Sequence, residues 1–253
     1  MDNIERLEQI RELINRNQHI TITQISEQFQ VSTATARRNL DALARQGKIQ
    51  RVHGGAVLIE KAPPELPVFQ RCNEQSDEKA RIGAVTAKLI QDGETIFLGA
   101  GTTVLEVANH LQDCHNLTVI TNSLLVENAL ANRQDINLIV MGGIFRSTEY
   151  TVYGHLTEQD VCQVNADKVI FGIRAINLEQ GLTNDFFPEI STDRAILKIG
   201  REVIIAADHT KFNRISTASV CPIANIHTVV TDDQTPQDTL TAISEMGIKV
   251  VVA

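Results

Sequence analysis

The 253-residue sequence has no long apolar run, no C-x-x-C cysteine pair and no self-similar repeat of 20 to 50 residues. A helical membrane span needs about 20 apolar residues, and charged residues interrupt the N-terminus from Asp2 onward, so we expect neither a membrane span nor a signal peptide. This predicts a cytoplasmic protein, and no metal or cofactor is expected. We interpret the four scattered cysteines as reduced packing residues rather than as disulfides or zinc ligands. They are Cys72, Cys114, Cys162 and Cys221.

An overall excess of positive charge is also missing, since the formal net charge is −8. The charges are unevenly distributed: residues 1–60 carry 8 Lys+Arg and 7 Asp+Glu, whereas residues 61–253 carry 15 and 24. Within residues 31–56, five basic residues accompany one acidic residue. A positive field is therefore confined to this stretch, and the acidic remainder is expected to face away from a polyanionic partner.

Proline is scarce, and three of the six prolines lie within residues 59–76, at Pro63, Pro64 and Pro67. Such a segment is typical of a stiff, extended linker rather than a helix. We therefore expect a first domain at residues 1–58, a linker at 59–75 and a second domain at 76–253.

Residues 31–57 begin with the pattern of a short basic helix. Ser32 is a good N-cap, and Ala36, Leu40 and Leu43 recur at helical spacing, so one face can pack inward. Threonine and arginine at the front of such a helix can reach base edges and phosphates in a major groove. The polar face consists of Thr33, Thr35, Arg37, Arg38 and Gln46.

A glycine hairpin follows this helix. Gly47 ends the helix, and residues 48–52 and 56–59 are strand-like runs around Gly54-Gly55, a pair that tolerates a tight turn. Arg51 and His53 flank the turn, where a wing would meet the DNA backbone. Two upstream helices are predicted from apolar stripes, the first formed by Ile4, Leu7, Ile10 and Ile14, the second by Ile22, Ile25 and Phe29.

These parts predict a winged helix-turn-helix, although a basic amphipathic helix can also be an ordinary solvated face. The order of parts favours DNA binding, because Gly-Gly follows the cationic helix where a wing should be. We expect contacts to double-stranded operator DNA from Ser32, Thr33, Thr35, Arg37, Arg38, Arg51, His53 and Gly54.

From Ile4 to Val57 the chain resembles the DNA-binding domain of the DeoR family of bacterial transcriptional regulators. That family's signature is a T-x-R-R-D-L-x-x-L-E helix followed by an R-x-H-G-G-A wing. Asn39 and Ala44 depart from it, standing where aspartate and glutamate are usual, and Asn39 could alter the hydrogen bonds that orient the neighbouring arginines. The matching residues are Thr35, Arg37, Arg38, Leu40, Leu43, Gly47, Arg51, His53, Gly54, Gly55 and Ala56.

The second domain alternates short apolar runs with helical patterns, one of which is a helix capped by Ser76 with Ile82, Val85 and Leu89 on its apolar face. Runs of this kind predict a mostly parallel, Rossmann-like α/β sheet buried on both faces. The apolar runs occupy residues 95–98, 117–121, 136–141, 168–173, 203–207, 227–231 and 249–252.

Ligands of such sheets bind at the carboxyl ends of the strands. Small and polar residues gather in four loops there, at 99–103, 121–123, 142–146 and 208–211. Glycine, threonine and helix-terminal amides can bind an anion, and a phosphosugar is the simplest ligand that uses them all. Each feature also has a structural reading, as a turn glycine, a helix cap at 121–123, or a solvated surface charge. The candidates are Gly101, Thr102, Thr103, Thr121, Asn122, Ser123, Gly142, Gly143, Arg146 and Lys211.

The resemblance extends into this domain, because the effector domain of the DeoR family is similar in fold to sugar-phosphate isomerases. It implies that a phosphorylated sugar binds these loops and changes affinity for an operator. Gly99, Arg174 and Asp193 depart from the pattern; Gly99 replaces an aspartate that could hold sugar hydroxyls. The matches are Glu78, Lys79, Gly101, Thr102, Thr103, Thr121, Asn122, Ser123, Gly142, Gly143, Arg146, Gly154, Gly172, Glu189, Lys211 and Phe212.

Three functions are compatible with these patterns. The favoured one is a ligand-responsive repressor of a carbohydrate-metabolism operon, acting as a homo-oligomer, either dimer or tetramer, because helix-turn-helix units usually read two half-sites. The alternative is an isomerase-like enzyme fused to a DNA-binding module, with Asp185, Glu189 and Asp208 as candidate bases. The missing acid at Gly99 speaks against turnover. An architectural DNA binder without an effector is the third.

Overall fold

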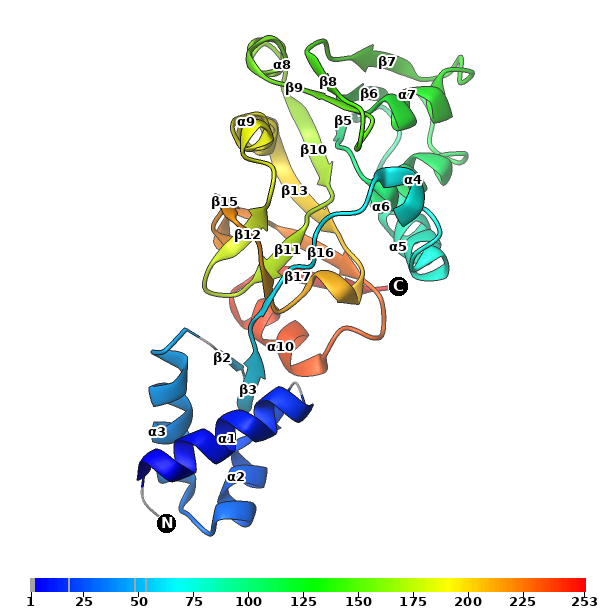
Figure 1. The fold of residues 1–253 in the computed structure, drawn as a ribbon. Coiled ribbons are helices and arrows are strands. Elements are labelled where there is room, and N and C mark those ends of the chain that lie inside the picture. The colour runs from blue at the N-terminus through cyan, green and yellow to red at the C-terminus, as the bar shows by residue number, and fades with distance from the viewer. Residues whose placement is uncertain (1–2, 18, 48, 53) are drawn as a thin grey trace.

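The computed structural model describes residues 3–17, 19–47, 49–52 and 54–253. It places a small winged domain at one end of the molecule and a larger α/β domain, here called the sensor domain, at the other (Figure 1). The last strand of the winged domain ends at Leu58. The expected DNA contact of His53 lies outside the described residues.

The winged domain contains three helices and a three-stranded antiparallel sheet in the order β1-β3-β2. The second helix begins with a capping box, in which Thr21 and Gln24 satisfy each other's backbone amides. Ile10, Ile14, Ile25 and Leu40 fill the core as the helical spacing predicts, whereas Ile4 is 68% exposed and does not join it. The elements are α1 (Asn3–Asn17), β1 (His19–Thr21), α2 (Ile22–Phe29), α3 (Thr33–Ala44), β2 (Ile49–Val52) and β3 (Gly55–Leu58).

The wing depends on two glycines that serve different purposes. Gly54 has a φ of 81°, a conformation that L side chains rarely adopt. Gly55 lies against β1, and a Cβ atom there would be 2.2 Å from the Ile20 carbonyl oxygen. The hairpin predicted around this pair is confirmed, and β1, which the sequence analysis did not predict, is the strand that makes Gly55 necessary.

A seven-stranded parallel sheet forms the centre of the sensor domain, in the order β17-β16-β13-β10-β5-β6-β7. Each of the seven apolar runs identified in the sequence supplies one strand, so the prediction of a parallel sheet is confirmed. The strands are β5 (Thr95–Leu98), β6 (Thr118–Thr121), β7 (Asn137–Val140), β10 (Ala166–Phe171), β13 (Gly200–Ala206), β16 (Thr228–Thr231) and β17 (Lys249–Val252).

Helices cover both faces of this sheet. Ile96 and Leu98 of β5 pack with the three helices that lie within residues 76–130. Phe97 points to the opposite face, which is covered by the three helices within residues 155–245. Ser76 is the first residue of its helix rather than the cap; Gln75, in the left-handed conformation with a φ of 49°, occupies the cap position without a side-chain hydrogen bond. The helices are α5 (Ser76–Ala87), α6 (Thr102–Asn109), α7 (Leu124–Leu130), α8 (His155–Val161), α9 (Ile190–Ile199) and α10 (Gln237–Glu245).

The segment between the domains is more structured than an extended linker. Its start forms β4 (Glu60–Lys61), which pairs with β14 (Arg214–Ile215), and its end forms the short helix α4 (Val68–Arg71). The Val68 amide also donates to the Thr148 carbonyl at 2.8 Å. The expected absence of helix is therefore wrong for Val68–Arg71, and the segment is attached to the sensor domain at both ends.

The remaining elements decorate the carboxyl edge of the sheet and the side of the domain near the wing. Two hairpins extend from the loops after β7 and β10. These elements are β8 (Ile144–Arg146), β9 (Thr151–Tyr153), β11 (Ala175–Asn177), β12 (Gly181–Asn184), β15 (Ala218–Cys221) and the 3-10 turns η1 (Phe187–Glu189), η2 (His209–Lys211) and η3 (Ile223–Asn225).

The strand order reverses at β5. From β5 the chain builds outward through β6 and β7, then returns to the other side of β5 with β10 and continues through β13, β16 and β17. The carboxyl ends of β5 and β10 therefore flank a topological switch point, the place where open α/β sheets bind ligands.

The two domains touch through a small polar interface. His19 of β1 lies 2.6 Å from Asp238 of α10, and the Gln50 side chain of β2 accepts a hydrogen bond from the Leu178 amide at 3.2 Å. Together with the segment after β3, these contacts link the wing to the sensor domain.

Candidate functional site

The polar face of α3 is exposed as the sequence predicts. Ser32 caps the helix by accepting a hydrogen bond from the Thr35 amide at 3.2 Å. Thr33, Arg37 and Arg38 are exposed, and neither arginine forms an ion pair with another described residue. Their side chains are therefore available to an external partner.

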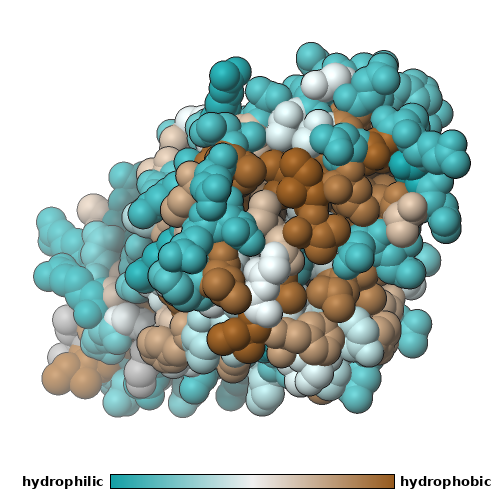
Figure 2. Space-filling model, turned by 90° about the horizontal axis from the view of Figure 1, so that it is seen from above, coloured by the Kyte–Doolittle hydropathy of each residue, from teal (hydrophilic) through white to brown (hydrophobic). Residues whose placement is uncertain are grey.

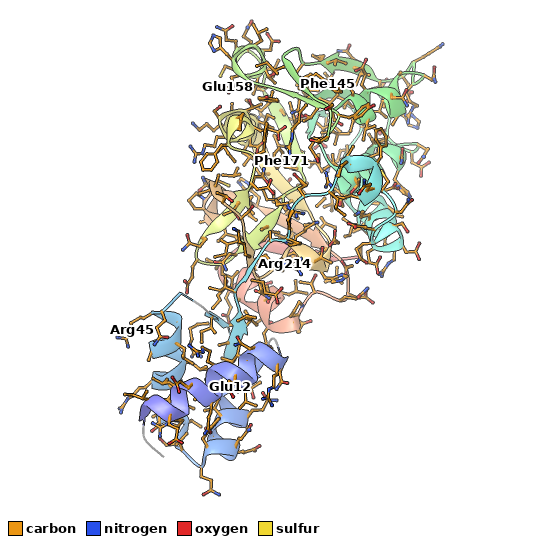
Figure 3. The ribbon with its side chains drawn as sticks, viewed as in Figure 1. Glu12, Arg45, Phe145, Glu158, Phe171 and Arg214 are labelled. Carbon is orange, nitrogen blue, oxygen red and sulfur yellow. The ribbon has the colours of Figure 1, made fainter. Side chains whose placement is uncertain are left out.

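Other cationic side chains near α3 differ in whether contacts within the domain hold them. Arg51 donates to the Gly55 carbonyl at 2.7 Å and pairs with Asp41 at 3.1 Å, so it braces the wing against α3. Arg45, which the sequence analysis did not single out, projects away from the end of α3 (Figure 3). Asn39 is 4% exposed and belongs to the inner face of α3, so it does not share the exposed surface of the helix arginines.

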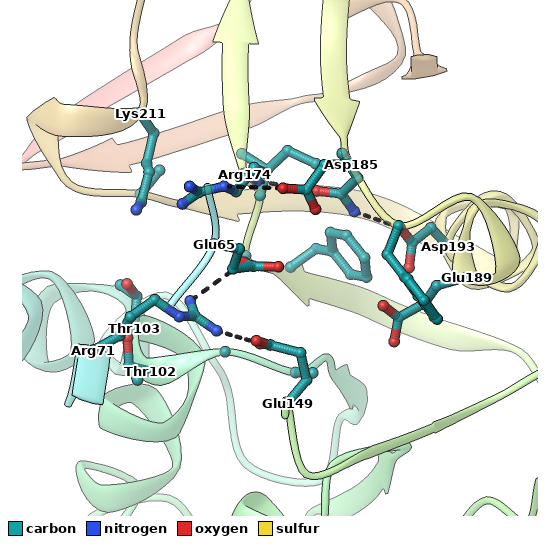
Figure 4. Close-up of a pocket in the computed structure, with 18 of the residues that line it drawn as sticks. Glu65, Arg71, Thr102, Thr103, Glu149, Arg174, Asp185, Glu189, Asp193 and Lys211 are labelled. Carbon is teal, nitrogen blue, oxygen red and sulfur yellow. Dashed lines mark hydrogen bonds and ion pairs between the residues drawn. The ribbon is translucent and has the colours of Figure 1, made fainter. Parts of the chain in front are cut away.

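A pocket lies at the switch point, between the carboxyl ends of the central strands (Figure 4). Loops after β5, β6, β10 and β13 contribute to its walls, and the segment from Glu65 to Arg71 closes one side. The lining residues are Glu65, Arg71, Ala100, Gly101, Thr102, Thr103, Asn122, Arg146, Glu149, Phe171, Gly172, Ile173, Arg174, Asn184, Asp185, Phe186, Glu189, Asp193, Ala206, Ala207 and Lys211.

Six of the ten candidates from the sequence line this pocket, namely Gly101, Thr102, Thr103, Asn122, Arg146 and Lys211. The other four, Thr121, Ser123, Gly142 and Gly143, are not among its lining residues and have structural contacts.

Local hydrogen bonds and close packing explain the position of those four residues. The Thr121 hydroxyl donates to the Leu98 carbonyl at 2.7 Å, and Ser123 is the N-cap of α7. A Cβ atom on Gly143 would lie 2.1 Å from the Thr157 hydroxyl, and that hydroxyl donates to the Gly142 carbonyl at 2.7 Å. Residues 121–123 were interpreted either as a helix cap or as ligand contacts. In the structure they serve mainly as a helix cap, and Asn122 is the one of the three that lines the pocket.

One side of the pocket is suited to an anion. Gly101, with a φ of 111°, starts α6 without any side-chain cap, so the first amides of the helix are left for another partner. Thr102 and Thr103 place their hydroxyls at the same end. Lys211 points toward them (Figure 4), and burial lowers the pKa of its ammonium although Asp208 opposes this. An anion here would gain both the helix terminus and the lysine.

The opposite side of the pocket is rich in carboxylates (Figure 4). Burial raises the pKa of Glu149, Glu189 and Asp193, most strongly that of Asp193, whose carboxylate accepts from Asn184 at 2.6 Å. Arg146 opposes the shift of Glu189, with which it pairs at 2.6 Å. Carboxyl groups with raised pKa values can accept and donate hydrogen bonds, as a polyhydroxyl ligand requires.

Arginines hold this carboxylate side together. Arg71 pairs with Glu149 and lies 3.6 Å from Glu65. Arg146 contacts the other oxygen of Glu65 at 3.3 Å, and its guanidinium stacks over the Phe186 ring at 4.1 Å. Arg146 was one of the candidate effector-binding residues, and in the structure it is paired with two carboxylates.

The sequence analysis missed the residues that the linker contributes. Glu65 and Arg71 come from a segment read as a spacer, and Glu149 comes from the turn between β8 and β9. The only available signal was local: charged residues lie beside the prolines of this segment.

The three departures from the family pattern in the sensor domain, Gly99, Arg174 and Asp193, all fall in or beside the pocket. A Cβ atom on Gly99 would lie 2.8 Å from the Phe171 ring, so that ring fills the space that a larger residue would need. Phe171 lies inside the sensor domain (Figure 3) and lines the pocket. Arg174 and Asp193 also line it. At the position where the family pattern has an aspartate, this chain therefore has Gly99 with the Phe171 ring packed against it.

The candidate bases for an isomerase reaction are held by other groups. Glu189 is paired with Arg146, and Asp208 accepts a hydrogen bond from the Thr210 amide at 3.0 Å as the cap of η2. Asp185 lies 3.8 Å from the Arg174 guanidinium.

Comparison with protein families covers almost the whole chain. Residues 6–62 match the DeoR-like helix-turn-helix domain, and residues 74–233 match the DeoR C-terminal sensor domain. The chain therefore belongs to the DeoR family, and the prediction made from its motifs is confirmed.

Full-length relatives agree with this assignment. The chain is 36% identical to the transcriptional repressor AccR of Agrobacterium fabrum over 98% of this chain and 97% of that protein. It is 33% identical to the glycerol-3-phosphate regulon repressor of Escherichia coli over 98% of both chains. The chain is accordingly a DNA-binding transcriptional repressor with an effector-sensing domain, and not an enzyme.

Among solved structures, the chain resembles ribose 5-phosphate isomerase A of Methanocaldococcus jannaschii, with a TM-score of 0.41 and 15% identity over 55% of each chain. Likeness at this level says nothing about catalysis. Within the part of the chain that the structure describes, no helix is both long and apolar enough to cross a bilayer. The same residues form no group of three or more His, Cys, Asp or Glu side chains placed to hold a metal ion.

Proposed function

We propose that this protein represses an operon of carbohydrate metabolism in the cytoplasm and that a phosphorylated sugar, bound in the sensor pocket, changes its affinity for operator DNA. The observation that carries the proposal is the convergence of Lys211, Thr102, Thr103 and the uncapped start of α6 at the switch point of the sheet. This arrangement suits a phosphate group.

The sugar part of the effector would face the carboxylate side. Two buried acceptors that line the pocket, Asn122 Oδ1 and Glu149 Oε1, have no hydrogen-bond partner among the described residues. Buried polar atoms are normally satisfied, so these oxygens are natural acceptors for sugar hydroxyls. Burial raises the pKa of Glu189 and Asp193 beside them, which favours the protonated form of each carboxyl.

DNA binding would use the exposed face of α3 in a major groove. Thr33, Arg37 and Arg38 are the candidates for base and phosphate contacts, and the exposed turn at Gly54 can approach the backbone of the DNA. Ser32 and Arg51 would act mainly by holding α3 and the wing in place, because their polar atoms are already hydrogen-bonded within the domain.

A homo-oligomer, dimer or tetramer, is part of the proposal, because half-sites about 34 Å apart are usually read by symmetry-related units. Apolar side chains gather at the end of the sensor domain far from the wing (Figure 2). Among the exposed ones are Ile144 and Phe145 of β8 and Leu156 of α8, with exposed fractions of 58%, 47% and 61%. Patches of this kind are common at protein interfaces.

The test is fluorescence anisotropy of the full chain on labelled DNA from its own promoter region, at a fixed salt concentration. A panel of phosphorylated sugars is compared with the same sugars without phosphate. We expect one phosphorylated compound to change operator affinity by roughly 5–150-fold, the usual range of allosteric coupling, and its unphosphorylated form to have no effect. Specific binding that no phosphorylated compound alters would contradict the proposed effector class.

A further inference from the structure

Arg174 is a buried arginine with few partners. Its side chain is 6% exposed, and it follows β10 in a loop whose conformation is fixed by a hydrogen bond from its own amide to Asn184 at 3.2 Å. The guanidinium donates to the Pro63 carbonyl. Nε is buried without a hydrogen-bond partner among the described residues, because Asp185 at 3.8 Å is beyond hydrogen-bond range. Guanidinium has five donors, so this group has capacity for an additional oxygen ligand.

Arg174 lies next to another cation. Lys211 and the Arg174 guanidinium converge on the side of the pocket where Thr103 lies (Figure 4). The charges of Arg174 and Arg71 both lower the pKa of the Lys211 ammonium, adding to the effect of burial. Buried like charges that converge in this way are stabilised when an anion binds between them.

The oxygen that Arg174 now contacts belongs to the segment between the domains. Pro63 follows β4, which pairs with β14, and Ala62 donates to the Ile215 carbonyl at 2.9 Å. Beyond Pro63, Glu65 lies between Arg71 and Arg146. The stretch from Ala62 to Val68 is thus a strap, attached to the pocket by the Arg174 and Glu65 contacts, and it continues from the wing strand β3.

We propose that Arg174 turns toward the effector to bind its phosphate together with Lys211, and that this movement competes with its hydrogen bond to the Pro63 carbonyl. The inference rests on the proposed function, since it assigns a residue and a consequence to the same pocket. A phosphate oxygen is a stronger acceptor for guanidinium than a carbonyl, because the bond is charge-assisted. Phosphate binding therefore loosens the strap at the end closest to the wing.

The first experiment titrates inorganic phosphate into the full chain and follows binding by ³¹P NMR. Arg174→Gln is expected to weaken binding at least about tenfold, as the loss of charge-assisted hydrogen bonds does. Arg174→Lys keeps the charge but cannot bridge two acceptors, so it should give an intermediate loss. Arg201→Gln is the matched control, because the Arg201 side chain is 85% exposed, and it should bind phosphate as the wild type does.

Equal phosphate binding by the wild type and Arg174→Gln would overturn the assignment, as would failure of the wild type to bind phosphate. If a phosphosugar still shifts the operator affinity of both proteins equally, the proposed function stands without Arg174. If no phosphorylated compound acts on the wild type, the proposed function fails as well.

A second experiment addresses the strap by hydrogen exchange. Saturating phosphate should accelerate exchange of the Ala62 amide, which donates to the Ile215 carbonyl, in the wild type, and Arg174→Gln should show the faster exchange without phosphate. The Val119 amide in the central sheet serves as the internal reference. Exchange in the strap that is identical in all these states would contradict the competition for Arg174.

Discussion

The arginines of α3 and those of the sensor pocket are in opposite situations. Arg37 and Arg38 are exposed and form no ion pair with a described residue. In the pocket wall, Arg71 is buried and paired with Glu149, and Arg146 is partly buried and paired with Glu189. Arginine side chains are thus unpaired on α3 and paired with carboxylates in the sensor pocket.

The difference follows from the environment in which each ligand is bound, a hydrated surface for DNA and a pocket for the effector. DNA brings its charge to the surface, where an unpaired arginine remains hydrated at little cost. A pocket arginine loses that hydration, so it needs a carboxylate whenever no ligand supplies an anion. We therefore expect operator binding to weaken steeply with salt, as counterion release requires, and effector binding to respond less, because buried pairs are weakly screened.

The largest effect should come from Gly55→Ala, which would disrupt the winged domain that holds Arg37 and Arg38 on α3. A Cβ atom 2.2 Å from the Ile20 carbonyl oxygen forces β1 and β3 apart. We expect a loss of about 2–4 kcal/mol in the stability of the winged domain, and a corresponding loss of operator binding, measured by urea unfolding and anisotropy.

Gly54→Ala is the control for this substitution, because a Cβ atom there meets nothing within 4 Å and only the φ of 81° is unfavourable. It should cost about 1 kcal/mol. Equal destabilisation by both changes would show that the close approach of β1 is not what requires Gly55.

Next in size, Arg37→Ala and Arg38→Ala test the free cations directly. Each should weaken operator binding by about 10–100-fold and reduce its salt dependence, without changing effector affinity. Arg201→Ala, at an exposed site in the sensor domain, should leave both affinities unchanged. If the helix arginines behave like Arg201 in anisotropy, α3 is not the recognition element.

Sequence alone predicts most of the framework on which this comparison depends. The seven sheet strands are continuous apolar runs because both faces of the sheet are covered, and the Gly54-Gly55 hairpin has a distinctive local pattern. The strand His19–Thr21 was missed because it is three residues long and is held by its pairing with β3 rather than by its own pattern. Ser76 failed as a cap because the left-handed Gln75 ends the preceding turn one residue earlier than expected.

The pocket was only half predictable for a related reason. Gly101, Thr102 and Lys211 follow strands, so the rule for α/β sheets locates them. Glu65, Arg71 and Glu149 do not follow strands of the sheet, and their charges look solvated until the chain folds over the pocket. A buried ion pair between distant segments leaves no periodic signal in sequence.

A smaller effect is expected from Lys211→Ala, which concerns the one pocket cation that forms no ion pair with a described residue. It should weaken binding of the active phosphosugar about tenfold and blunt its effect on DNA, while operator affinity without effector stays normal. Lys88→Ala, at an exposed position beyond α5, is the control. A normal ligand response in Lys211→Ala would move the phosphate away from α6.

The smallest expected effect concerns the pH dependence of the paired pocket. Burial and the nearby Glu65 raise the pKa of Glu149 to about 7, with Arg71 opposing. The folded protein therefore holds a proton that the unfolded chain releases near pH 4.5, and this stabilisation is complete at low pH and lost as pH rises toward 7. Glu149→Gln should remove that decline, raising stability at pH 8 relative to the wild type by about 1 kcal/mol, less than the shift alone implies because the charged carboxylate still pairs with Arg71.

Urea unfolding of both proteins between pH 4.5 and 8 measures this difference, with the exposed Glu179→Gln as control. If the stability gap between wild type and Glu149→Gln stays constant across that range, Glu149 is ionised throughout and the Arg71 pair outweighs burial. The pocket arginines would then be neutralised by permanently charged partners, and effector binding would have to displace a carboxylate rather than a partly protonated acid.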